Sequence, residues 1–123
     1  MALDVLIVDD SAAIRKILTR VLAQTNLALG RIHEANDGQE ALERMRTETV
    51  GLVLSDINMP NMDGLEFLKA LKSNPAWQNI PVMMVTTEGS QDKVLLALKL
   101  GAVGYVKKPF TPDQIKEKLT GIV

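Results

Sequence analysis

The sequence predicts a single α/β domain in which five parallel strands alternate with five helices. Short, β-branched apolar runs alternate along the chain with segments whose apolar residues recur at helical spacing. Five such strand–helix units occupy all 123 residues, without a linker or a low-complexity tract. Strands that are joined by helical crossovers run parallel and carry helices on both faces of their sheet. We therefore expect one doubly wound (βα)₅ domain over residues 1–123.

The first two strand–helix units are the most clearly patterned. The run Leu3–Val8 is short and continuously apolar, as in a strand buried on both faces. Ser11 suits the N-cap of the next helix, whose apolar residues recur at i, i+3, i+4, i+7 and i+8. The weaker run Arg31–Ala35 predicts an edge strand, and residues 36–38 predict a turn into a second helix. His33, on this edge strand, is expected to be solvated.

The rest of the chain repeats this order three times. The expected elements are a strand at Gly51–Asp56 and a helix at Gly64–Lys72, a strand at Ile80–Thr87 and a helix at Asp92–Leu100, and a strand at Val103–Lys107. The last helix follows Thr111, where T-P-D-Q has the pattern of a capping box with proline at the first helical position. The fourth helix is apolar on more than one side, so it either offers a contact surface or packs on two neighbours.

Composition excludes several classes of function. The net charge of −1 and the sequence pI near 5.8 give no field that would attract nucleic acid or an anionic membrane. With 3% aromatic residues, a base-stacking platform is not expected, and the absence of cysteine excludes disulfides and thiol chemistry. The first residues lack the basic flank of a signal peptide, and their apolar run is too short for a membrane span. A cytoplasmic protein is expected.

Polar side chains follow four of the five predicted strands. Asp9 and Asp10 follow the first strand, Asp56 ends the third, Thr86 lies at the end of the fourth, and Lys108 follows the fifth. An acid after a strand is ordinarily a turn residue or a helix cap. All of these positions, however, lie at the carboxyl edge of a parallel sheet, where such folds bind ligands. We therefore expect the five side chains to form one site.

The chemistry of these five residues favours phosphoryl transfer. Three converging carboxylates repel one another, and a hard divalent cation relieves that repulsion. Oxygen ligands without histidine or cysteine favour Mg²⁺, or Mn²⁺, over zinc. A lysine facing the same point suits a phosphoryl group, and a threonine hydroxyl adds a hydrogen bond. In this arrangement Asp56 is the predicted nucleophile.

Four segments carry a family resemblance: LIVDDS, LVLSDINMPNMDGLEFLK, PVMMVTTEG and GAVGYVKKPFTPDQIKEKL. Together they resemble a response-regulator receiver domain, and among these the single-domain chemotaxis regulators, over essentially the whole chain. The resemblance implies a flavodoxin-like fold with strand order 2-1-3-4-5. It also implies a signalling switch of a two-component system that catalyses only its own phosphorylation and dephosphorylation.

The resemblance assigns roles to the residues at the sheet edge. Asp56 is similar to the phospho-acceptor, and Asp9 and Asp10 to the acids of the Mg²⁺ site, where Asp56 and the backbone carbonyl of Asn58 complete the protein ligands. Lys108 resembles the lysine that holds the phosphoryl oxygens, and its bond to the following proline is expected to be cis.

The resemblance further implies a partner kinase and an output face. The donor would be a phosphohistidine of a histidine kinase or a small phosphate donor, and the receiver would be a monomer. Thr86 resembles a switch hydroxyl, and Tyr105 an aromatic that turns inward when Thr86 moves. The output face would combine the fourth helix, fifth strand and fifth helix, with Val94, Tyr105, Lys107 and Lys118 binding a downstream protein. Lys107 departs from the usual small apolar residue, so the flagellar motor switch is one candidate target among others.

The expected lifetime of the phosphorylated state depends on two flanking positions. Asn58 and Glu88 stand two residues beyond Asp56 and Thr86, and the resemblance implies that they would flank the approach of the hydrolytic water. Both match residues of fast-resetting chemotaxis regulators, which implies a short-lived phosphoryl group.

Three other interpretations remain. A Mg²⁺-dependent phosphohydrolase with an aspartyl nucleophile would need a D-x-D motif and a cap, and Asp56-Ile57-Asn58 lacks the second acid. As a second alternative, the chain is a receiver cut from a longer response regulator. A receiver that binds without being phosphorylated is disfavoured, because every residue the chemistry needs is present.

Overall fold

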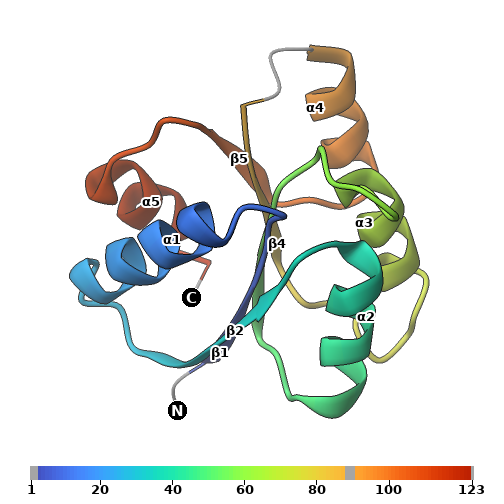
Figure 1. Ribbon diagram of the computed structural model, residues 1–123, viewed down its shortest axis with the longest axis horizontal. Coiled ribbons are helices and arrows are strands. Elements are labelled where there is room, and N and C mark those ends of the chain that lie inside the picture. Colours follow the sequence, from blue (N-terminus) through green and yellow to red (C-terminus); the bar gives the residue numbers. More distant parts are fainter. Residues whose placement is uncertain (1–2, 88–90, 123) are drawn as a thin grey trace.

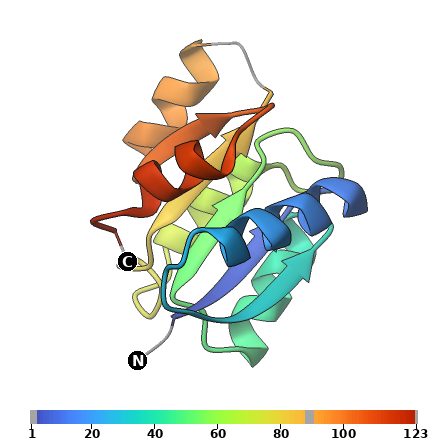
Figure 2. The same cartoon turned by 90° about the vertical axis from the view of Figure 1, so that its left-hand side faces the viewer.

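The computed structural model describes residues 3–87 and 91–122 and has the predicted architecture (Figure 1). Five parallel strands form one sheet in the order β2-β1-β3-β4-β5, as expected. The elements are β1 (Leu3–Val8), α1 (Ala12–Gln24), β2 (Leu29–Ala35), α2 (Gly38–Thr47), β3 (Leu52–Ser55), α3 (Gly64–Lys72), β4 (Val82–Thr86), α4 (Gln91–Lys99), β5 (Gly104–Lys107) and α5 (Pro112–Leu119). Helices α1 and α5 cover one face of the sheet, and α2, α3 and α4 cover the other (Figures 1 and 2).

The alternation of side chains along each strand divides the interior into two cores. In β1, Val5 and Ile7 pack against α1 and α5, whereas Leu6 and Val8 pack on the opposite side with Phe67 of α3. Strands β3 and β4 divide in the same way, and all their residues are buried. Their continuously apolar sequences follow from this, because helices cover both faces.

The boundaries of several strands differ from those predicted by one or two residues. Strand β4 begins at Val82 rather than Ile80, and Pro81 just before it has no N–H to donate to a ladder. Strand β3 ends at Ser55, so Asp56 lies just beyond it, although its N–H still donates to the carbonyl of Val8 at 2.9 Å. The acid is thus held at the sheet edge with its side chain outside the ladder.

The edge strand β2 contains the clearest differences from expectation. It begins at Leu29, two residues earlier than predicted, and its register against β1 shifts between Leu3 and Val5. The carboxylate of Asp4 accepts a hydrogen bond from the N–H of Arg31 at 2.9 Å there. His33 is not solvated: its side chain is 11% exposed, and Nε2 lies 3.1 Å from the other Asp4 oxygen. The pattern of the edge strand alone does not reveal a partner 29 residues away.

Side-chain caps fix where the helices begin. The hydroxyl of Ser11 accepts from the N–H of Ile14 at the start of α1, as predicted. Thr111 and Gln114 form the expected capping box of α5, with proline in the first turn. A second capping box, between Asp63 and Glu66, begins α3 directly after the turn that follows Asp56.

Gly64 allows the start of α3 to approach the acid-bearing strand end. Its N–H donates to the carbonyl of Ile57 at 2.7 Å. A Cβ at this position would overlap the carbonyl oxygen of Asp56 and lie 2.8 Å from the Cα of Ile57. Both of these are backbone atoms, so a side chain at position 64 would displace the loop that presents Asp56.

We therefore expect Gly64→Ala to lower the free energy of unfolding by about 1–3 kcal/mol, as overpacking of a tight site does. Equilibrium urea denaturation followed by circular dichroism measures the change. Gly104→Ala is the matched control, because its Cβ would meet nothing nearer than the Met83 sulfur at 3.4 Å. Equal losses in the two variants would contradict the close-approach explanation.

Within residues 3–87 and 91–122, no helix is both long enough and apolar enough to cross a membrane.

Candidate functional site

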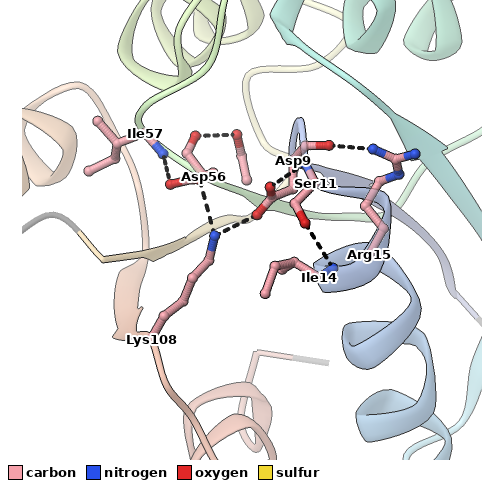
Figure 3. A network of polar contacts seen from close by, with 8 residues as sticks. Asp9, Ser11, Ile14, Arg15, Asp56, Ile57 and Lys108 are labelled. Carbon is pink, nitrogen blue, oxygen red and sulfur yellow. Dashed lines mark hydrogen bonds and ion pairs between the residues drawn. The ribbon is translucent and has the colours of Figure 1, made fainter.

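The carboxyl ends of β1, β3 and β5 bring two acids and a lysine into direct contact (Figure 3). Nζ of Lys108 donates to Oδ2 of Asp9 at 2.6 Å and to Oδ2 of Asp56 at 3.1 Å. These residues come from positions 9, 56 and 108 of the sequence, and parallel strand order alone brings them together. The predicted convergence of these three side chains is confirmed.

Every polar atom of Asp9 is held by a different part of the fold. Its N–H donates to the carbonyl of Ala35 at 3.1 Å, and its carbonyl accepts from Nη1 of Arg15 at 2.6 Å. Its carboxylate accepts from the N–H of Ser11 through Oδ1 at 2.9 Å and from Lys108 through Oδ2. Asp9 is 2% exposed. It is therefore a rigid part of the site.

Asp56 is slightly more accessible than Asp9, and both of its carboxylate oxygens have a partner. Its Oδ1 accepts from the N–H of the next residue, Ile57, at 2.7 Å, while Oδ2 faces Lys108. The hydroxyl of Ser55 donates to the Asp56 carbonyl at 2.9 Å, which fixes the backbone. The side chain of Asp56 is 10% exposed, so its carboxylate reaches the surface within a fixed frame.

The ammonium of Lys108 is stabilised by the two acids. Desolvation alone would lower its pKa, but the hydrogen bonds to Asp9 and Asp56 and the charges of both acids outweigh it, and the pKa of Lys108 is raised above its ordinary value of 10.5. The lysine is therefore charged throughout the neutral range. Its position between two carboxylates makes it a fixed counter-charge at the mouth of the site.

The donor set at this edge fits a hard divalent cation. Asp9, Asp10 and Asp56 each offer a carboxylate oxygen, and these atoms lie within 4.8 Å of one another. The three ligands are all oxygen, as Mg²⁺ and Mn²⁺ prefer. Asp9 and Asp56 are buried and Asp10 is exposed, so two of the acids are fixed and the third faces solvent. A divalent metal can be held here, and the contribution of the Asn58 carbonyl stays a prediction.

Comparison with known proteins decides the family. The family model described as the response regulator receiver domain matches residues 5–120. The chain belongs to the response regulator receiver domain family. Receiver domains of this kind are signalling switches and are not generally classed as enzymes.

Individual relatives agree with this assignment. A chemotaxis protein CheY homolog of Campylobacter jejuni is 40% identical over 119 residues, which are 96% of this chain and 90% of that protein. The structure of the chemotaxis response regulator CheY4 of Vibrio cholerae superposes with a TM-score of 0.88 at 33% identity, covering 100% of both chains. A CheX–CheY–BeF3–Mg²⁺ complex from Borrelia burgdorferi contains a chain with a TM-score of 0.88 at 29% identity, covering 98% of this chain and 90% of that one.

The residues predicted to sense phosphorylation surround the end of β4 in this receiver domain. Thr86 is 1% exposed, and its carbonyl accepts from the N–H of Lys108 at 2.9 Å. Thr86 pairs with Lys107, and Met84 pairs with Tyr105, so Thr86 and Tyr105 lie on the same face of the sheet. Tyr105 is 42% exposed. The bond between Lys108 and Pro109 is cis, as expected.

Three of the four residues predicted for the output face of the receiver domain lie together. Tyr105, Lys107 and Lys118 line a groove of about 420 Å³ between β5 and α5. Val94 does not line this groove and is half-buried on α4. The fourth helix exposes Leu95, Leu96 and Leu98, which leaves the contact-surface interpretation of that helix in place.

Several contacts around the acids were not revealed by the sequence. Of the two positions predicted to set the lifetime of the phosphoryl group, Glu88 lies outside the described residues. Asn58 is exposed, and its Oδ1 lies 3.4 Å from Nζ of Lys93 in the first turns of α4. Asn61 donates to Oδ2 of Asp37, the N-cap of α2, at 2.8 Å, which ties the turn after Asp56 to a second helix. None of these pairs has a spacing pattern by which sequence alone could identify it.

Proposed function

We propose that this receiver domain, over residues 1–123, accepts a phosphoryl group on Asp56 and works as a phosphorylation switch. The observation that carries the proposal is the carboxylate of Asp56, which is 10% exposed, is fixed at the sheet edge 3.1 Å from the charged Lys108 and is clustered with Asp9 and Asp10. A nucleophile, a counter-charge and a site for a divalent cation are the components that phosphoryl transfer requires.

In the proposed reaction, a carboxylate oxygen of Asp56 attacks the phosphorus of the donor. The new O–P bond forms as the donor's bond to phosphorus breaks, and the imidazole of a histidine kinase or the acetate of acetyl phosphate leaves. Lys108 binds a phosphoryl oxygen, while the Ile57 N–H holds Oδ1 of Asp56. Mg²⁺, or Mn²⁺, held by Asp9, Asp10, Asp56 and the Asn58 carbonyl, would supply further positive charge to the phosphoryl oxygens.

The phosphorylated state would be read on the face formed by α4, β5 and α5. A phosphoryl group bound by Lys108 adds negative charge beside Thr86, whose hydroxyl would shift towards it and let Tyr105 turn inward. The groove lined by Tyr105, Lys107 and Lys118 would then change shape and bind a downstream protein, with Val94 of α4 as a further contact outside the groove. The relatives that are named as chemotaxis proteins favour a chemotaxis pathway. We further propose a cytoplasmic monomer, with the flagellar motor switch as one candidate target.

Incubation with acetyl phosphate, followed by intact mass spectrometry, tests the proposal. We expect one phosphoryl adduct in the presence of Mg²⁺ and none when EDTA is present. After the donor is removed, the adduct should decay within minutes, because water attacks phosphorus and releases phosphate from Asp56. An adduct that is independent of the metal would contradict the proposed site, and one that persists for many hours would contradict the predicted roles of Asn58 and Glu88. Continuous turnover of small phosphate esters would instead favour the phosphohydrolase.

A further inference from the structure

Arg15 is a half-buried cation that the proposed chemistry does not use. It lies at the start of α1, as Figure 3 shows. Its side chain is only 12% exposed. Its Nη1 donates to the Asp9 carbonyl at 2.6 Å, and its Nε donates to Oε1 of Glu34 at 2.9 Å. One guanidinium thus connects α1, the loop after β1 and the edge strand β2.

The carbonyl that Arg15 binds belongs to the peptide group between Asp9 and Asp10. Because a peptide group is planar, a hydrogen bond to its oxygen restricts the Cα atoms of both residues. Asp9 has three further partners, but the exposed Asp10 depends on its backbone for its position. The orientation of this peptide therefore determines where the Asp10 carboxylate lies relative to the other two acids.

From this geometry we propose that Arg15 is a positioning residue for the metal site, and that Glu34 orients its guanidinium. The proposal rests on the function proposed above, since it concerns the same acids. Among the described residues, Arg15 donates to Glu34 and to the Asp9 carbonyl, and to none of the three carboxylates of the metal site. It acts through the backbone of Asp9. The planar fork of an arginine suits this role, because it reaches Glu34 and the Asp9 carbonyl at the same time.

The positive charge of Arg15 and its positioning role have opposite effects on the affinity for Mg²⁺, so an experiment can separate them. Removing a positive charge near three carboxylates should by itself strengthen the binding of a divalent cation. Loosening the Asp9–Asp10 peptide should weaken that binding, as loss of a partner behind a metal ligand commonly does by 10–100-fold. Arg15→Lys keeps the charge and loses the fork, and Arg15→Gln loses both.

The test is calorimetric titration of the metal-free protein with Mg²⁺. We expect the affinity for Mg²⁺ to fall on the order of 10-fold in both Arg15→Lys and Arg15→Gln. Arg20→Gln is the matched control, because it removes an exposed charge from the same helix and should leave the affinity unchanged. Unchanged affinity in Arg15→Lys, or tighter binding in Arg15→Gln, would overturn the proposal.

Hydrogen exchange of the metal-free protein is the second measurement. The Ser11 N–H, which donates to the Asp9 carboxylate, should exchange faster in both Arg15 variants than in Arg20→Gln. Equal exchange in the three variants would overturn the proposed role of Arg15. Because this measurement needs no metal, it decides that role even if the parent protein fails to bind Mg²⁺, a result that would contradict the proposed function itself.

Discussion

Asp56→Asn is expected to abolish phosphorylation by acetyl phosphate. The amide keeps the size of the side chain but is a very poor nucleophile, and it cannot carry the charge that Lys108 faces at 3.1 Å. Intact mass spectrometry in the presence of Mg²⁺ should show an adduct on the parent protein and none on the variant. The reason is chemical, so the loss should be complete rather than partial.

The control for Asp56→Asn is Asp113→Asn, which makes the same change at an exposed acid of α5 that does not belong to the cluster. It should be phosphorylated as the parent is. Circular dichroism should show that both variants are folded. A phosphoryl adduct of undiminished yield on Asp56→Asn would place the acceptor elsewhere and remove the basis of the proposed switch.

Lys108→Gln is expected to cause the largest loss of stability among these variants. The side chain is 11% exposed and is the counter-charge of both Asp9 and Asp56. Removing one partner from such a pair leaves the other charges uncompensated and commonly costs about 3 kcal/mol or more. We expect a loss of about that size in urea denaturation at pH 7 without metal. Addition of Mg²⁺ should recover more stability in the variant than in the parent, because the cation replaces the missing charge.

The pH dependence of the Lys108 contribution follows from the direction of its pKa shift. The pKa is raised above the ordinary value of 10.5, so the stabilisation is complete below pH 10.5 and is lost as pH rises through the higher pKa of the folded state. Lys108 is therefore protonated at pH 7, and the difference in the free energy of unfolding between the parent and Lys108→Gln is fully present there. The exposed neighbour Lys107, changed to Gln, is the matched control and should lose little. An equal loss in both variants, or no recovery with Mg²⁺, would contradict the role of Lys108.

The sequence predicts the fold because local patterns and topology agree. A continuous apolar run such as Leu3–Val8 indicates burial on both faces, and helices packing on both sides of the sheet account for it. The convergence of Asp9, Asp56 and Lys108 follows from parallel strand order. Helix α3 begins and ends at the predicted residues, Gly64 and Lys72.

The contacts that sequence analysis missed are those between residues remote in sequence without a repeating pattern. His33 is paired with Asp4, whose other carboxylate oxygen a Cβ at Gly30 would overlap, and the edge-strand pattern is the same with or without that pair. In the sequence, Arg15 does not differ from any other cation on an amphipathic helix. Its hydrogen bond to the Asp9 carbonyl is seen only in the structure. Tertiary packing, not periodicity, determines such pairs, so a single sequence carries no signal for them.

The most direct test of the central claim is to locate the phosphoryl group. Reduction of the phosphorylated protein with borohydride converts an aspartyl phosphate to homoserine, and cleavage after Arg46 and Lys69 releases a peptide that contains both Asp56 and Asp63. Tandem mass spectrometry distinguishes the two positions. Homoserine at position 56 alone is the predicted result. Reduction at Asp63, at Asp9 or Asp10, or at no aspartate in a protein that carries the adduct would contradict the account.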